Sequence, residues 1–301
     1  MLEFKPHYVV KPWGNRRFES RFGRELPSGT IGESWELSGG CDQISEVASG
    51  PKTGKLLNEL WAEGALGGSA SGDFPFLLKW IDTNERMSAQ VHPDLDFCRA
   101  TQCGAPKTEA WVIAELESKS KLLIGNYPGL DSEILVQALQ RGSLEKWMYE
   151  SMPRVGDMFL IEAGTLHAIG AGFLILEVQE PSDVTFRVCD WERVDENGQS
   201  RELHVEQAIH AIDYNRFDMP RAQRAEVEGP SFHLRAVPMG ATLSAEEQLR
   251  VFVGHSPQTS LLVTKNQQYS LKYGDVLVAE PSDGPISVAS GKCILITEPL
   301  E

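Results

Sequence analysis

Short apolar runs that end at glycine or proline turns recur along this chain of 301 residues. Residues 157–162, 166–169 and 173–180 are clear examples, each shorter than a typical helix and bounded by turn residues. The chain contains 27 glycines and 17 prolines, which supply many such turns. This pattern predicts a mainly β protein.

Helical signals are fewer and lie between these runs. Further strands are expected within 4–40 and at 74–82, 87–92, 108–116 and 121–125, although a helix is also compatible with 108–116. Helices are expected at 56–60, 131–141 and 204–212. The spacing of Leu135, Ala138 and Leu139, with Gly142 as a stop signal, predicts a small helical insert at about 129–150.

A Gly-Asp turn that leads into an apolar strand occurs twice, at residues 155–161 and 273–279. The second copy has no histidine near it, whereas the first is followed by His167. We therefore expect two related β-barrels, of which one carries the chemistry. The expected domains are a catalytic domain over 1–215 and a degenerate C-terminal domain over 216–301.

The charge of the chain restricts its partners. A formal net charge of −15 argues against a general role on nucleic acid or on an anionic membrane surface. The same charge repels an anionic small molecule, so such a substrate requires a local cluster of lysine, arginine or metal charge. No run of about eighteen apolar residues occurs, so no transmembrane helix is expected.

The cysteines indicate the compartment. Their number is five, which is odd, and no C-x-x-C pair occurs among them. Free thiols in a reducing cytoplasm fit this count better than a disulfide framework does. The first ten residues also lack the apolar core of a signal peptide, so we expect a cytoplasmic protein.

Four side chains suggest a metal site. Gln90 and His92 are two apart on an expected strand and therefore point to one face. Glu109 begins the next strand, and His167 follows a Gly-Thr turn. Two imidazoles, a carboxylate and an amide oxygen suit zinc or a similar divalent ion. The competing interpretation is that both histidines are structural.

Five segments resemble those of one family, in the same order. Residues 163–169 (AGTLHAI) look like the PAGTxHAI signature of type I phosphomannose isomerases. Residues 156–167 resemble the second cupin motif, with Glu162 in place of the usual proline. The other matching segments are residues 11–14, 33–36, 88–94 and 107–111.

The resemblance implies a fold and an activity. The fold would be a pair of cupin jelly-roll barrels, one catalytic and one degenerate. One zinc ion per chain would be held by Gln90, His92, Glu109 and His167. The activity would be that of an intramolecular oxidoreductase that interconverts mannose 6-phosphate and fructose 6-phosphate through an enediol. The only partner implied is this small sugar phosphate, bound by a monomer or a homodimer.

The same resemblance implies roles for six more residues. Arg187 would stabilise the enediolate or bind a sugar oxygen, and Asp183 and Lys107 would assist proton transfer or contact substrate. Asp183 and Arg187 are four apart, so an extended strand would present both to one side, where an ordinary ion pair is the alternative. The expected substrate-binding residues are Ser88, Trp13 and Glu36. The base that takes the carbon-bound proton stays open between Lys107, Asp183 and a metal-bound water.

Two other functions compete with this hypothesis. One is a cupin that binds a sugar or a metal without catalysis, because one fold can serve many functions. The other is a related isomerase that acts on a different sugar. A binding module is expected to lose at least one ligand or charged pocket residue, and this chain retains all of those candidates, which favours an enzyme.

Overall fold

The computed structural model describes residues 1–40, 43–68, 72–195, 197–216, 220–244 and 248–299. Across these ranges strands far outnumber helices, which confirms the expected mainly β fold. None of the helices in the described ranges is long and apolar enough to cross a membrane. Cys98, Cys103, Cys189 and Cys293 are free, and Cys41 lies outside the described residues.

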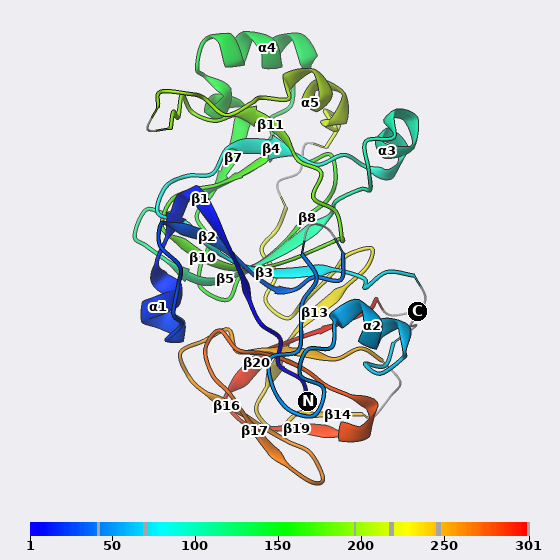
Figure 1. Ribbon diagram of the computed structural model, residues 1–301. Helices are drawn as coiled ribbons and strands as arrows, with labels where there is room; N and C mark the ends of the chain where they lie inside the picture. The colour runs from blue at the N-terminus through cyan, green and yellow to red at the C-terminus, as the bar shows by residue number, and fades with distance from the viewer. Residues whose placement is uncertain (41–42, 69–71, 196, 217–219, 245–247, 300–301) are drawn as a thin grey trace.

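The first barrel consists of two antiparallel sheets, in the upper half of Figure 1. The six-stranded sheet has the spatial order β1 (His7–Asn15), β2 (Ile31–Leu37), β3 (Leu77–Asp82), β10 (Phe173–Gln179), β5 (Glu109–Leu116) and β8 (Met158–Ile161). The five-stranded sheet has the order β11 (Phe186–Cys189), β4 (Ala89–Val91), β9 (His167–Ile169), β6 (Leu122–Asn126) and β7 (Met148–Ser151). Buried side chains such as Trp111 and Ile124 fill the space between the sheets.

The second barrel repeats this arrangement in the lower half of Figure 1. One sheet has the order β12 (Glu226–Glu228), β13 (His233–Pro238), β20 (Lys292–Thr297), β15 (Val251–Val253) and β18 (Val276–Val278). The other has the order β14 (Thr242–Leu243), β19 (Ile286–Ser290), β16 (Ser260–Val263) and β17 (Gln268–Leu271). The two jelly-roll barrels agree with the expected cupin architecture. The domain limits at 215 and 216 stay a prediction, and Leu2 forms a bridge with Val278 of the second barrel.

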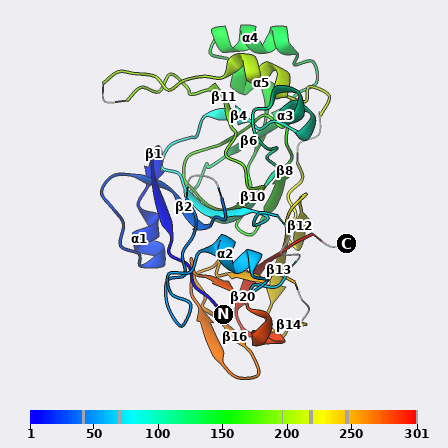
Figure 2. The ribbon, with the colours of Figure 1, turned by 45° about the vertical axis from the view of Figure 1, so that its right-hand side comes forward.

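Five short helices lie at the periphery of the barrels, as Figures 1 and 2 show. They are α1 (Arg17–Phe22), α2 (Leu57–Ala62), α3 (Leu95–Thr101), α4 (Ser132–Gln140) and α5 (Val205–Ala211), with 3-10 turns at Leu144–Trp147 and Pro281–Asp283. The expected insert is present as α4 and the turn after it, and Asp131 caps α4 by accepting a hydrogen bond from Ile134 N at 2.8 Å. The sequence did not predict α1 or α3.

The two barrels share an apolar core that has buried polar contacts beside it. The largest cluster of buried side chains joins Trp80 of the first barrel to Leu234 of the second. Beside it, Arg24 Nη1 donates to Glu36 Oε1 at 2.6 Å, and Arg24 Nη2 donates to the Gly274 carbonyl at 2.6 Å. A Cβ at Gly274 would lie 2.3 Å from Phe22 Cγ, so this close approach of the barrels requires glycine.

Replacing Glu36 by alanine leaves the guanidinium of Arg24, whose side chain is only 16% exposed, without its carboxylate. We expect Glu36→Ala to lower the free energy of unfolding by about 3 kcal/mol, because removing one partner of a largely buried ion pair is costly. Urea denaturation followed by circular dichroism measures this change. Glu19→Ala, which breaks the exposed pair with Arg16, is the matched control and should cost less than about 1 kcal/mol. Equal effects of the two variants would contradict the structural role given to Glu36.

Candidate metal centre and active site

Strand pairing aligns three of the expected functional residues across the five-stranded sheet. Arg187 of β11 lies opposite Gln90 of β4, and Gln90 lies opposite His167 of β9. Residues that are directly opposite in antiparallel strands project their side chains from the same face. The sheet therefore presents a guanidinium, an amide and an imidazole in one row.

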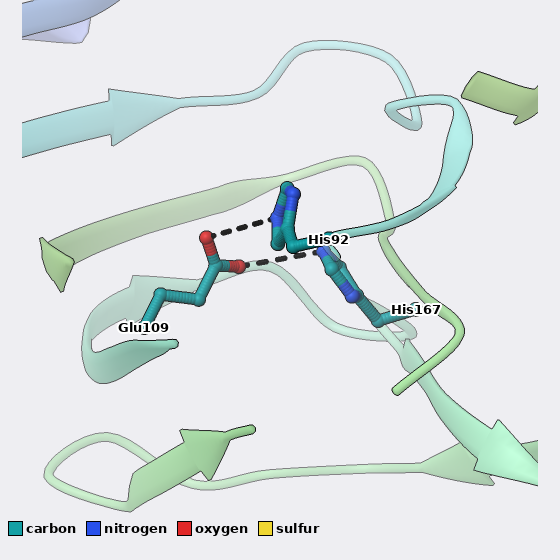
Figure 3. Close-up of side chains that lie close together, drawn as sticks. All are labelled: His92, Glu109 and His167. Atoms are coloured by element: carbon teal, nitrogen blue, oxygen red, sulfur yellow. Dashed lines mark ion pairs between the residues drawn. The ribbon is translucent and has the colours of Figure 1, made fainter. Parts of the chain in front are cut away.

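Glu109 approaches this row from the other sheet. It begins β5, and its carboxylate points toward both imidazoles in Figure 3. Glu109 Oε2 lies 3.2 Å from His92 Nε2, and Glu109 Oε1 lies 3.4 Å from His167 Nε2. All three side chains are buried, and their donor atoms lie within 4.8 Å of one another. His92, Glu109 and His167 thus form a group that could hold a metal ion.

Backbone carbonyls fix the tautomer of both imidazoles. His92 Nδ1 lies 3.1 Å from the Val184 carbonyl, and His167 Nδ1 lies 2.9 Å from the Thr165 carbonyl. A carbonyl only accepts, so each Nδ1 donates and each neutral ring keeps a lone pair on Nε2. His92 Nε2 and both oxygens of Glu109 are buried without a hydrogen-bond partner in the described residues. A cation among these lone pairs satisfies all of them.

Burial and neighbouring charge keep these groups in the protonation states that a metal requires. Burial lowers the pKa of His92 to about 3, and the nearby Lys107 ammonium acts in the same direction. Burial also lowers the pKa of His167. Burial opposes ionisation of Glu109, but the Lys107 Nζ, 3.3 Å from Oε2, helps to hold the pKa of that carboxyl well below its usual range. Near neutral pH the group is two neutral imidazoles and a carboxylate.

A cavity of about 230 Å³ opens beside this group. Five cationic side chains line it: Lys11, Lys79, Lys107, Arg187 and Arg201. Four carboxylates, those of Glu33, Glu109, Glu177 and Asp183, also line it, so five cations and four anions leave the cavity with a formal charge of +1. In a chain with a net charge of −15, this local positive charge favours the entry of an anionic substrate.

Most of the residues singled out from the sequence meet at this cavity. Trp13, Ser88, Gln90, Lys107, Glu109, Asp183 and Arg187 line it, and His92 and His167 contact Glu109. Asp183 precedes β11 instead of lying on it, yet it reaches the same cavity as Arg187.

Glu36 does not lie at the cavity, contrary to the expectation that it binds substrate. The alternation of side chains along β2 turns Glu33 toward the cavity and Glu36 toward Arg24 and the second barrel. The motif at residues 33–36 thus contributes to the cavity through its first residue.

Several residues that line the cavity were not predicted from the sequence. Glu177 lies opposite Lys79 across β10 and β3, and its Oε1 is 2.9 Å from Lys79 Nζ. Lys79 had no partner that the sequence could identify, and the available signal for Glu177 was a charged residue inside the apolar run 173–180. Lys11 pairs with Glu33 at 3.1 Å, and Arg201 lies 14 residues beyond Arg187 without any distinguishing pattern.

The comparisons with known proteins agree with one another. The family model described as "Phosphomannose isomerase type I, catalytic domain" matches residues 1–110. A putative mannose-6-phosphate isomerase of Bacillus subtilis is 32% identical over 97% of this chain and 96% of its own length. The mannose-6-phosphate isomerase of Streptococcus mutans is 37% identical over 67% of this chain, and the match spans 64% of that protein. The crystal structure of a mannose 6-phosphate isomerase from Bacillus subtilis superposes with a TM-score of 0.87, at 30% identity and 99% coverage of both chains.

The low pKa of His92 predicts acid sensitivity in the metal-free protein. An unfolded imidazole takes up a proton near pH 6.5, whereas folded His92 does so only near pH 3. The unfolded state therefore binds more protons between these values, and stability falls as the pH drops below 6.5. We expect His92 alone to lower the free energy of unfolding by about 2 kcal/mol at about pH 5 relative to neutral pH, as measured by urea unfolding. His92→Asn should show a correspondingly smaller loss, and an unchanged pH dependence would contradict the assignment.

Proposed function

This chain belongs to the type I phosphomannose isomerase family, and on that premise we propose that it interconverts mannose 6-phosphate and fructose 6-phosphate with one zinc ion as cofactor. The observation that carries the proposal is the buried group of His92, Glu109 and His167, whose lone pairs converge at a cation-lined cavity. The reaction transfers a proton between C1 and C2 of the open-chain sugar, so the site must accept a proton and stabilise an enediolate.

The proposed zinc ligands are His92, Glu109, His167 and Gln90. The Gln90 Nε2 lies 3.1 Å from His167 Nε2, and exchange of the amide nitrogen and oxygen by rotation would bring the oxygen to the same place. Nitrogen and oxygen donors of this kind are those that zinc binds in catalytic sites. Zinc, when bound, supplies a Lewis acid that polarises the oxygen atoms on C1 and C2.

Arg187 is the proposed electrostatic partner of the enediolate. It lies opposite Gln90 in the sheet, and within the described residues no carboxylate lies within 4.0 Å of its guanidinium. Its positive charge therefore stays available to a substrate oxygen. Lys107, which is buried beside Glu109, adds a second positive charge to the cavity.

Two side chains of this protein are candidates for the base that accepts the carbon-bound proton. The cavity contains four carboxylates, those of Glu33, Glu109, Glu177 and Asp183. The first three contact lysine ammonium groups, whereas Asp183 has no ion pair among the described residues. We propose Asp183 as the carboxylate that accepts the proton. Lys107 is the alternative, and it can accept the proton only after its ammonium has released one, because only the neutral amine has a lone pair.

The remaining features of the proposal concern binding and location. Ser88 and Trp13 line the cavity and are the proposed contacts to the sugar phosphate. We also propose a cytoplasmic enzyme, active as a monomer or homodimer, and the four free thiols in the described residues support a reducing compartment.

The direct test measures the formation of fructose 6-phosphate from mannose 6-phosphate together with the zinc content. A chelator should abolish turnover and added zinc should restore it. His92→Ala should lose both zinc and activity, while His210→Ala, an exposed histidine of α5, should retain both. A His92→Ala protein with full zinc and full turnover would refute the metal assignment.

Arg187→Ala separates catalysis from metal binding. We expect kcat to fall about 1,000-fold, because a preorganised charge at the developing enediolate is lost, while the zinc content stays at one per chain. Arg187→Lys should recover part of the rate, since it keeps the charge but not the planar donor geometry. Steady-state kinetics and metal analysis on the same samples measure both. Loss of zinc together with unfolding would show that Arg187 is structural.

A further inference from the structure

Arg201 is held rigidly at the cavity wall by a buried carboxylate. Its Nε and Nη2 donate to the two oxygens of Asp190 at 2.7 and 2.6 Å. Asp190 is buried and also accepts from Arg193 Nη1 at 2.9 Å. The third nitrogen of Arg201, Nη1, makes no hydrogen bond within the part of the chain that the structure describes. Arg201 therefore presents a fixed, unused donor edge.

The hydrogen bonds at the edge of the five-stranded sheet show where Arg201 lies relative to the group of His92, Glu109 and His167, here called the metal group. Strand β11 is the edge strand, with β4 on one side. On its other side, Arg187 N donates to His204 Nδ1 at 3.1 Å and His204 N donates to the Arg187 carbonyl at 2.8 Å. Arg187 Nη1 also donates to the Glu202 carbonyl at 2.7 Å. The order across the sheet is therefore the segment 201–204, Arg187, Gln90 and His167.

The arginines of the cavity are less fully paired with carboxylates than its lysines are. The lysines of the cavity each contact a glutamate: Lys11 with Glu33, Lys79 with Glu177 and Lys107 with Glu109. Arg187 has no carboxylate within 4.0 Å in the described residues, and Arg201 shares Asp190 with Arg193, which also contacts Glu85 at 3.5 Å. Asp183 lines the same cavity but forms no ion pair with either arginine in the described residues, so Arg187 and the free edge of Arg201 keep donors that an anion can accept.

We infer that Arg201 binds the phosphate group of the substrate and that Asp190 positions it for this contact. The inference rests on the proposed function, since it uses the same cavity. In an open-chain hexose 6-phosphate the phosphate is at the opposite end from C1 and C2. With C1 and C2 beside the metal group, the chain of the sugar passes Arg187 and its phosphate reaches Arg201. A guanidinium edge fixed by a carboxylate suits phosphate better than a mobile lysine does.

The test compares mannose 6-phosphate with unphosphorylated mannose as substrates. Arg201→Ala should lower kcat/KM for the phosphorylated sugar about 100-fold, mainly through KM, because a charged hydrogen bond is lost. The kcat/KM for mannose should stay within about threefold of the native value. Asp190→Asn should raise KM for the phosphorylated sugar with kcat retained. An equal loss for both sugars would show a structural role and overturn the inference.

Arg193→Ala is the matched control. This variant removes a positive charge from the same carboxylate, Asp190, but Arg193 does not line the cavity. The ratio of kcat/KM for mannose 6-phosphate to kcat/KM for mannose should therefore equal that of the native protein. If the native protein turns over neither sugar, the proposed function fails, and calorimetric titration with inorganic phosphate then tests Arg201 alone. Binding to the native protein that is lost in Arg201→Ala supports the anion site. Binding that is absent, or equal in both proteins, refutes it.

Discussion

The carboxylate of Glu109, buried between two imidazoles and an ammonium, is the constraint on which the rest of the first barrel depends. A buried anion is costly unless charges and donors surround it. Here Lys107 lies 3.3 Å from one oxygen, and His92 and His167 face the two oxygens. The barrel must therefore be polar here, whereas Trp111 and Ile124 belong to an apolar cluster that packs beside this group.

The neighbouring ion pairs extend the same principle along the cavity. Lys79 contacts Glu177 at 2.9 Å and Glu33 at 3.9 Å, and Lys11 contacts Glu33 at 3.1 Å. These side chains come from strands whose register places them together, so the field in the cavity is set when the sheet forms. A site of this kind needs little rearrangement as charge develops on the substrate.

Local patterns in the sequence were enough to predict the strands, the helix at 132–140 and the residues near the metal group. Alternation and turn residues act over short distances, so these features have a local signature. The family resemblance supplied the ligand set, which spacing alone left open. Glu33 and Glu36 could not be told apart from the sequence, since a shift of one residue along β2 reverses the face that each presents. Glu177 and Arg201 depend on pairing between distant segments, and that pairing has no local signature. The choice between Asp183 and Lys107 as base depends on the bound substrate.

The contact between His204 and Arg187 has a consequence for solubility. An edge strand normally offers unpaired N–H and C=O groups to any other extended chain. Along β11 the backbone of Arg187 is already bonded on its outer side, by the ring and the amide of His204. The residues that hold the arginine end of the cavity therefore also protect this margin of the barrel from strand-to-strand association between molecules.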